Sequence, residues 1–197
     1  THFALIDSHT SDIVNDDRSA IKRFLRGLDF YLVQDFDSSI ADMTQAVLLD
    51  DTFFPAYFVR ALLRCKQLEY MKAEAIIDSN LPHQARSQEN EVGKFNMEYE
   101  LIRKDLDKVI EIAPDYVYAY YNRSHVLSQL KDYRGALADY DKAISLYPNF
   151  AEAYFNRGLI HIFIGDNNKG VSDLSKAGEL GIASAYNIIK RFSLVQN

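Results

Sequence analysis

The sequence predicts an all-helical fold in which helix hairpins stack against one another. Three observations support this prediction. The stretch AYYNRSHVLSQLKDYRGALADYDKAISLYPNF, residues 119–150, is followed at once by AEAYFNRG, which begins with nearly the same letters. Apolar residues recur at spacings of three and four in both copies, which is the pattern of an amphipathic helix. A polar interruption lies near the middle of each copy, where one helix can end and another begin.

Aligning the copies defines units of 34 residues, which span residues 20–53, 117–150 and 151–184. A fourth unit, residues 54–116, begins with FPAYFVRALL and closes with LDKVIEIAPDY, and it carries an insertion at about residues 69–97. A hairpin of two amphipathic helices cannot cover its own apolar face, so it must bury that face against its neighbours. The repetition therefore predicts an α-solenoid.

Small residues lie where the two helices of a unit must touch. They are Gly27, Ala61, Ser124 and Gly158 in the first helices, and Ala46, Ala143 and Ala177 in the second helices. Without bulky side chains at these places, the two backbones can approach closely. A short turn separates the helices, and the Asp of each turn can cap the second helix. The turns are Gln34 and Asp35, Lys131 and Asp132, and Gly165 and Asp166.

This spacing of small, aromatic and alanine residues resembles the tetratricopeptide repeat family. The residues that carry the resemblance are Ser124, Leu127, Tyr133, Ala136, Tyr140, Ala143 and Pro148 in one unit, and Gly158, Gly165 and Ala177 in the next. The first unit departs from the pattern, because Asp51 stands where the family usually has Pro. The resemblance implies a right-handed solenoid of four repeats that serves as a non-catalytic module for protein–protein interaction.

One charge pair recurs in every unit. The seventh residue is Arg and the twenty-third is Asp, and an antiparallel hairpin brings these two places level with each other. The pairs are Arg26 with Asp42, Arg60 with Asp105, Arg123 with Asp139, and Arg157 with Asp173. We expect structural ion pairs that tie the two helices of each hairpin together, rather than a ladder of arginines that binds a ligand.

The pairing also locates the insertion. If Arg60 and Asp105 lie opposite each other in the hairpin, the turn of the second hairpin falls near Pro82, inside the loop-like stretch SNLPHQARSQEN. We therefore expect one elongated hairpin that projects as an arm, with helices from about residue 55 to 78 and from about residue 89 to 112. The alternative is a second helix of normal length that ends near residue 78, followed by an additional helix.

Two segments flank the repeats. Residues 1–17 lack convincing periodicity and predict a tail or the remnant of a preceding segment. Because the chain begins at Thr1 and shows no signal-peptide pattern, we expect an upstream portion to be missing from it. Residues 182–194 carry apolar side chains along one face only, which predicts a helix that caps the last repeat.

Composition excludes several classes of function. A net charge of -6 and a pI of about 5.3 disfavour binding to nucleic acid, whose phosphates attract Lys and Arg. No apolar run approaches the roughly 20 residues that cross a bilayer, so we expect a soluble chain without membrane insertion. Cys65 is the only cysteine, which excludes an internal disulfide. The sequence carries no recognisable catalytic, phosphate-binding or metal-binding motif, so we expect no enzymatic activity, no cofactor and no metal.

The resemblance further implies a concave groove built mostly from first helices. The groove residues it implies are Phe24, Phe58, Tyr121 and Phe155 at one level, Leu28, Leu62, His125 and Leu159 at the next, and Asn122 and Asn156 beside them. Such a surface suits an extended peptide or an amphipathic helix of a protein partner, whose identity the sequence does not give. For each ring, the alternative is that it packs between repeats.

A second function stays open at this point. The arm could make the chain a self-association module that forms a homodimer through exposed apolar residues such as Ile76 and Ile77.

Overall fold

The computed structural model describes residues 2–15, 18–79 and 88–195, and all of the regular structure in these ranges is helical. The side chains of residues 15, 74–79, 88–94 and 193–195 lie outside the description. The chain forms two compact units, Thr1–Pro114 and Asp115–Asn197, which we treat separately. The all-helical architecture agrees with the predicted fold class.

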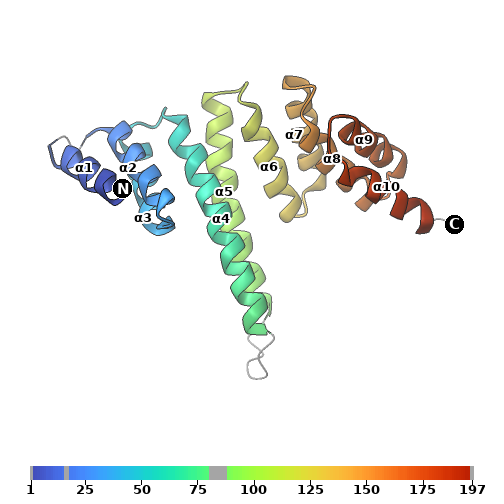
Figure 1. The fold of residues 1–197 in the computed structure, drawn as a ribbon, viewed down its shortest axis with the longest axis horizontal. Helices are drawn as coiled ribbons and strands as arrows, with labels where there is room; N and C mark the ends of the chain where they lie inside the picture. The colour runs from blue at the N-terminus through green and yellow to red at the C-terminus, as the bar shows by residue number, and fades with distance from the viewer. Residues whose placement is uncertain (1, 16–17, 80–87, 196–197) are drawn as a thin grey trace. The chain divides into compact units, whose positions relative to one another are not determined.

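The described residues of the first unit form five helices. They are α1 (His2–Asn15), α2 (Ala20–Leu32), α3 (Phe36–Leu49), α4 (Phe54–Ser79) and α5 (Gln88–Ile112) (Figure 1). Each helix packs on the one that follows it in the chain. Helices α2 and α3 form the hairpin of the first predicted repeat, and α4 and α5 form the hairpin of the second.

Helix α1 occupies the segment for which the sequence predicts a tail or a remnant. Two polar contacts join it to α2: His9 Nδ1 lies 2.5 Å from Asp29 Oδ2, and Arg26 Nη1 donates to Thr10 Oγ1 at 3.3 Å. Ile13 is the only apolar residue of α1 that is buried among those described. One buried apolar residue is too few to give the sequence a clear apolar stripe.

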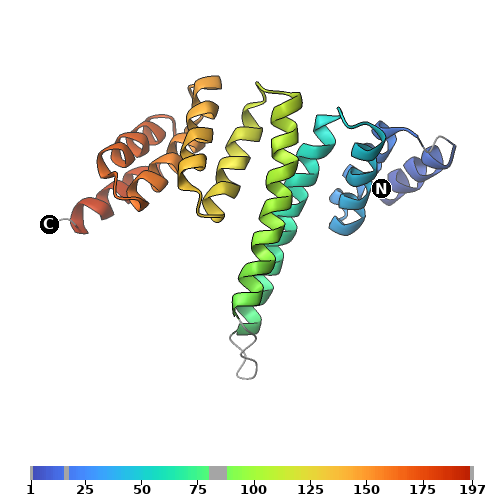
Figure 2. The same cartoon turned by 180° about the vertical axis from the view of Figure 1, so that it is seen from behind.

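Helices α4 and α5 run side by side over their described lengths in both views of the chain (Figures 1 and 2). The structure thus forms a single long pair here, without an additional helix among the described residues, and the predicted turn at Pro82 and His83 lies outside them. Buried apolar residues of the two helices include Leu68, Tyr99, Ile102, Leu106 and Val109. Polar bonds also cross between the helices, from Arg60 and Arg64 to Asp105.

The second unit also holds five helices. They are α6 (Val117–Gln129), α7 (Tyr133–Leu146), α8 (Ala151–Phe163), α9 (Asn167–Glu179) and α10 (Ser184–Val195). Helices α6 and α7 form one hairpin, α8 and α9 form the next, and α10 packs on α9. The predicted capping helix corresponds to α10. Its Tyr186 ring lies so close to Gly178 that a β-carbon at Gly178 would be 2.5 Å from the ring.

The turns inside the hairpins share one geometry. Asp35, Asp132 and Asp166 each cap a second helix, and each accepts a hydrogen bond from the backbone N–H three residues ahead. The residue before each Asp has a positive φ: 64° at Gln34, 65° at Lys131 and 90° at Gly165. This left-handed residue reverses the chain between the two helices of each hairpin.

Candidate functional site

The recurring arginines each bind an aspartate of the same hairpin through two hydrogen bonds. In every pair, Nε and Nη2 of the arginine donate to the two carboxylate oxygens, at distances between 2.5 and 2.9 Å. The pairs are Arg26–Asp42, Arg60–Asp105, Arg123–Asp139 and Arg157–Asp173. All four aspartates are buried. The hydrogen bond to Asp42 raises the pKa of Arg26, and the bond to Asp173 raises the pKa of Arg157.

Three of these arginines also reach a third helix, which sequence reasoning missed. Nη1 of each donates to a side chain 16 residues earlier, in the helix that precedes the hairpin. The pairs are Arg26 with Thr10 at 3.3 Å, Arg60 with Thr44 at 3.2 Å, and Arg157 with Asp141 at 2.6 Å. The constant spacing of 16 was a signal in the sequence, although the residue type at that place varies. These guanidinium groups are engaged inside the fold and do not form a free cationic surface.

In the first unit, two of the predicted groove residues face the core. Phe24 and Leu28 pack against the buried cluster around Met43, and the Phe24 ring meets the Phe53 ring edge-on with centroids 5.2 Å apart. Phe58 is half-buried. Leu62 is 38% exposed. Of the four groove positions in this unit, Leu62 offers the most surface to a partner.

In the second unit, both groove amides are bonded within the chain. Asn122 Nδ2 donates to the backbone oxygen of Tyr118 at 2.7 Å, and Asn156 Nδ2 donates to the Tyr121 hydroxyl at 3.1 Å. The Tyr121 ring packs on Phe150 with centroids 4.7 Å apart, and burial raises the pKa of its phenol. The structure therefore uses Tyr121 and both amides for internal contacts.

The remaining groove positions of the second unit divide in the same way. Phe155 packs against the cluster of Leu174, Ala177 and Ala185. His125 is exposed, and Leu159 is 36% exposed. The predicted residues that stay accessible are thus Leu62, His125 and Leu159, which occupy the same place in three first helices.

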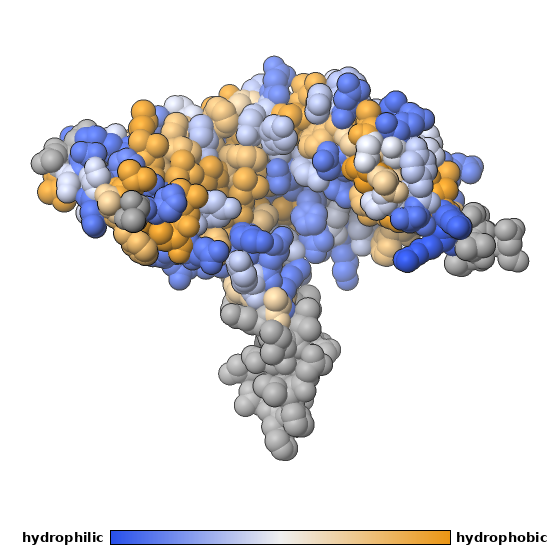
Figure 3. Space-filling model, viewed as in Figure 1, coloured by the Kyte–Doolittle hydropathy of each residue, from blue (hydrophilic) through white to orange (hydrophobic). Residues whose placement is uncertain are grey.

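A row of exposed aliphatic residues on α2 also escaped the sequence analysis. Ile21 is 60% exposed, Leu25 is 40% exposed and Leu32 is 53% exposed. The space-filling view shows apolar residues gathered over the α2 and α3 region of this unit (Figure 3). The signal was present in the sequence as aliphatic residues on one side of α2, and Leu25 occupies the repeat place that Asn122 and Asn156 hold in the second unit.

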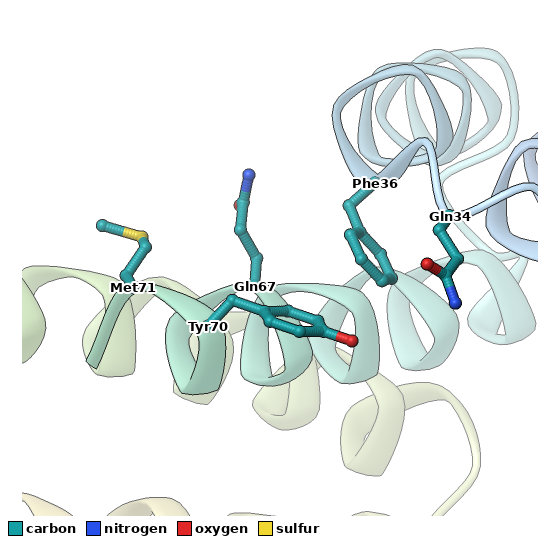
Figure 4. A pocket seen from close by; sticks show the side chains of 5 residues that line it. All are labelled: Gln34, Phe36, Gln67, Tyr70 and Met71. Atoms are coloured by element: carbon teal, nitrogen blue, oxygen red, sulfur yellow. The ribbon is translucent and has the colours of Figure 1, made fainter. Parts of the chain in front are cut away.

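A shallow pocket of about 370 Å³ lies where the α2–α3 turn faces α4. Gln34, Phe36, Gln67, Tyr70 and Met71 line it, and the Phe36 ring points toward α4 (Figure 4). The rings of Phe36 and Tyr70 are 5.6 Å apart. Gln67 already donates to Asp37 at 2.7 Å. The Phe36 ring also packs on Tyr31 and against the buried cluster around Met43.

A second pocket, of about 500 Å³, lies between α7 and α9 over α8. Its charged residues are paired internally: Arg157 with Asp141 and Asp173, and Lys169 with Asp166. His161 Nδ1 is buried without a hydrogen-bond partner in the described structure and lies 3.8 Å from Asp166 Oδ2. Each of these charged groups is thus already bonded to an opposite charge within the second unit.

The described residues give little support for a metal site or for a reactive nucleophile. No group of three metal-ligating side chains comes together there. Burial raises the pKa of the Cys65 thiol to about 11, which leaves little reactive thiolate at neutral pH. Among the described helices, none has the length and apolar character that a membrane span requires.

Two family models match parts of the second unit. Residues 125–162 match a model described as TPR repeat, and residues 151–180 match one described as tetratricopeptide repeat. The search of curated proteins found no match.

Several solved structures share the fold. A crystal structure of MamA is 20% identical with a TM-score of 0.70, covering 92% of this chain and 89% of that one. MamA from Desulfovibrio magneticus RS-1 is 13% identical with a TM-score of 0.71, covering 91% and 85%. A thermophilic TPR protein of Thermus thermophilus is 12% identical with a TM-score of 0.62, covering 100% and 91%. At these identities the likeness concerns the fold alone.

Proposed function

Because this chain is a tetratricopeptide-repeat protein, we propose that it is a non-catalytic scaffold whose first helices receive a segment of a partner protein. The observation that carries the proposal is made in each unit separately: a first helix leaves a leucine accessible at the same place of the repeat, Leu62 on α4 in the first unit and Leu159 on α8 in the second. These side chains lie outside the arginine–aspartate pairs that hold the hairpins. Exposed apolar residues at repeated places favour contact with another protein.

The exposure of the groove residues also determines which substitutions can test the proposal. Replacing Phe155 or Tyr121 would disturb packing inside the second unit, since both rings contact buried neighbours. Leu62 and Leu159 are 38% and 36% exposed, so replacing them changes accessible surface and should disturb packing less than replacing either ring. Variants at these two leucines therefore separate loss of binding from loss of folding.

The test is capture of partners from an extract of the source cells by the immobilised chain, read out by quantitative mass spectrometry. The double variant Leu62→Gln, Leu159→Gln should lose the partner that the wild type captures. Leu49→Gln is the matched control, because Leu49 is 41% exposed on the second helix α3. A partner retained by the double variant but lost by the control would contradict the proposal.

Self-association through the long hairpin is the second candidate. The exposed residues Met97, at 72%, and Leu101, at 38%, favour it, since both lie on α5 in the described part of the arm. The side chains of Ile76 and Ile77 lie outside the described residues. Light scattering at several concentrations should then show a dimer, and deletion of residues 71–92 should yield a monomer. A wild-type chain that stays monomeric throughout would exclude this candidate.

A further inference from the structure

We propose that the first unit carries a second docking site, where the α2–α3 turn faces α4, and that this site receives a proline-rich segment of a partner protein. The site is the pocket of about 370 Å³ lined by Gln34, Phe36, Gln67, Tyr70 and Met71 (Figure 4). These residues are distinct from the groove residues that the family resemblance implies. The inference therefore goes beyond the proposed scaffold function and adds a separate surface to it.

The pocket exists because α4 is longer than the other first helices. Helices α2, α6 and α8 each have 13 residues, whereas α4 has 26. Gln67, Tyr70 and Met71 follow the thirteenth residue of α4, so they lie on the additional length of that helix. Gln34 and Phe36, from the turn and the start of α3, line the pocket opposite them. A repeat of ordinary length has no such wall, so the pocket is a feature of this chain rather than of the repeat.

Two aromatic rings form the apolar part of the pocket. The centroids of Phe36 and Tyr70 are 5.6 Å apart, and the planes of the rings meet at 38°. Phe36 is fixed by its contacts with Tyr31 and with the buried cluster around Met43, whereas Tyr70 is 47% exposed. A fixed ring beside an exposed one offers apolar area to a partner without a rearrangement of the fold.

The polar groups beside these rings favour a partner with free backbone carbonyls. Among the described residues, the Gln34 amide and the Tyr70 hydroxyl have no hydrogen-bond partner. Both can donate to a carbonyl oxygen. The carbonyls of a helix are already bonded within that helix, so a helical partner would cover these two groups without satisfying them. A polyproline II segment makes no internal hydrogen bonds, and its carbonyls are free to accept.

Proline also suits the size of the pocket. Because the pocket is shallow, a partner buries little area there and must lose little conformational freedom on binding. A proline-rich segment already populates the polyproline II conformation when it is free. Proline has no N–H group that would need an acceptor, and proline-rich segments dock on surfaces lined by aromatic side chains. These properties favour a proline-rich segment over other extended segments.

The charges at the hairpin tip indicate what flanks the prolines. Asp35 and Asp37 are exposed, and among the described residues no cation is bonded to either of them. They accept instead from a backbone N–H and from the Gln67 amide. Lys66 of α4 is already bonded to Glu69. An arginine or lysine of the partner would therefore meet two carboxylates that lack an ion pair, so the segment carries a basic residue beside its prolines.

The test begins with two phage libraries of random peptides, each about twelve residues or four polyproline II turns long, panned on the immobilised full chain. One library has Pro-x-x-Pro fixed at its centre, and the other has Ala-x-x-Ala. The proline library should be enriched at least about tenfold over the alanine library, with Arg or Lys beside the prolines of the selected peptides. Absence of enrichment, or equal enrichment of the alanine library, overturns the inference.

Fluorescence anisotropy of the most enriched peptide then locates the site. Tyr70→Ala should weaken its binding about tenfold, whereas Tyr70→Phe, which keeps the ring, should weaken it only about threefold. Asp37→Asn should weaken it about threefold at low salt and less at high salt. Tyr147→Ala is the control, because Tyr147 is 48% exposed but lies in the second unit, and it should leave the affinity unchanged. Binding that Tyr70→Ala does not weaken overturns the site.

Two further measurements separate this inference from its alternatives. Circular dichroism of each variant checks that its helices are intact. A stapled helix with leucines along one face that binds at Tyr70 more tightly than the best proline peptide overturns the proline-rich class of partner. The double variant Leu62→Gln, Leu159→Gln should bind the proline peptide as the wild type does, so the capture experiment and this one succeed or fail independently.

Discussion

Arg157 and Asp173 form a two-point ion pair: Nε and Nη2 of the arginine donate to the two carboxylate oxygens at 2.7 and 2.6 Å. The third nitrogen, Nη1, donates to Asp141 of the preceding helix α7 at 2.6 Å. One guanidinium thus joins the two helices of its own hairpin to the hairpin before it. Arg26 and Arg60 repeat this arrangement in the first unit with threonine acceptors. Neighbouring hairpins are therefore linked by directed polar bonds in addition to apolar packing.

Removing one member of such a pair should cost more than removing both. Arg123→Met leaves the Asp139 carboxylate, which is 6% exposed, without the arginine that binds both of its oxygens. We expect this variant to lose about 3 kcal/mol of unfolding free energy, and Arg123→Met combined with Asp139→Leu to lose less. Urea denaturation of the wild type, both single variants and the double variant measures the coupling. Additive effects would show that the pair contributes nothing as a pair.

The repeat register could be predicted from the sequence because it depends on a fixed period. The positions of Arg60 and Asp105 were sufficient to align the two helices of the long hairpin with each other despite the insertion. Helix α1 could not be predicted in the same way. Its contacts to α2 include the polar side chains of His9 and Thr10, and Ile13 alone among its described apolar residues is buried, which leaves little apolar periodicity in the sequence.

The candidate site was harder to predict, because position in a repeat does not determine exposure. Phe24 and Tyr121 occupy equivalent places, and each is covered by a phenylalanine from the loop before the next helix. Phe53 covers the first and Phe150 covers the second. Both phenylalanines are the last residue of their repeats, so an alignment of repeat ends carries the signal that these rings pack inward.

The turn between α6 and α7 offers a stabilising substitution. Lys131 has a φ of 65°, a left-handed conformation in which a β-carbon costs about 1 kcal/mol, while the equivalent Gly165 avoids this cost. We expect Lys131→Gly to raise the unfolding free energy by about 0.5 kcal/mol, after allowing for the larger backbone entropy of glycine. Gly165→Ala should lower it by about 1 kcal/mol. Thermal unfolding followed by circular dichroism measures both, and a destabilised Lys131→Gly would refute the strain argument.

Cys65 should react slowly with alkylating reagents. Burial, and to a smaller extent the charge of the nearby Glu69, raises the pKa of its thiol from 9.0 to about 11. Because the thiolate is the reactive form, the rate with iodoacetamide at pH 8 should be about a hundredfold below that of a thiol with the ordinary pKa. Mass spectrometry of timed samples gives the rate, with urea-unfolded chain as the reference. Equal rates in the folded and unfolded states would contradict the burial of this side chain.

Tyr140 should make the fold sensitive to high pH. This side chain is 1% exposed, and burial raises the pKa of its phenol from 10.0 to about 12. The folded state therefore favours the neutral phenol. The stability from this residue is fully present below pH 10, where the unfolded phenol is also neutral, and it is lost as pH rises from about 10 to 12. In that range the wild type should lose up to about 1.4 kcal/mol per pH unit more than Tyr140→Phe, which cannot ionise. Urea titrations of the two proteins at several alkaline pH values measure the difference. Parallel curves above pH 10 would show that the Tyr140 phenol ionises as readily in the folded chain as in the unfolded one.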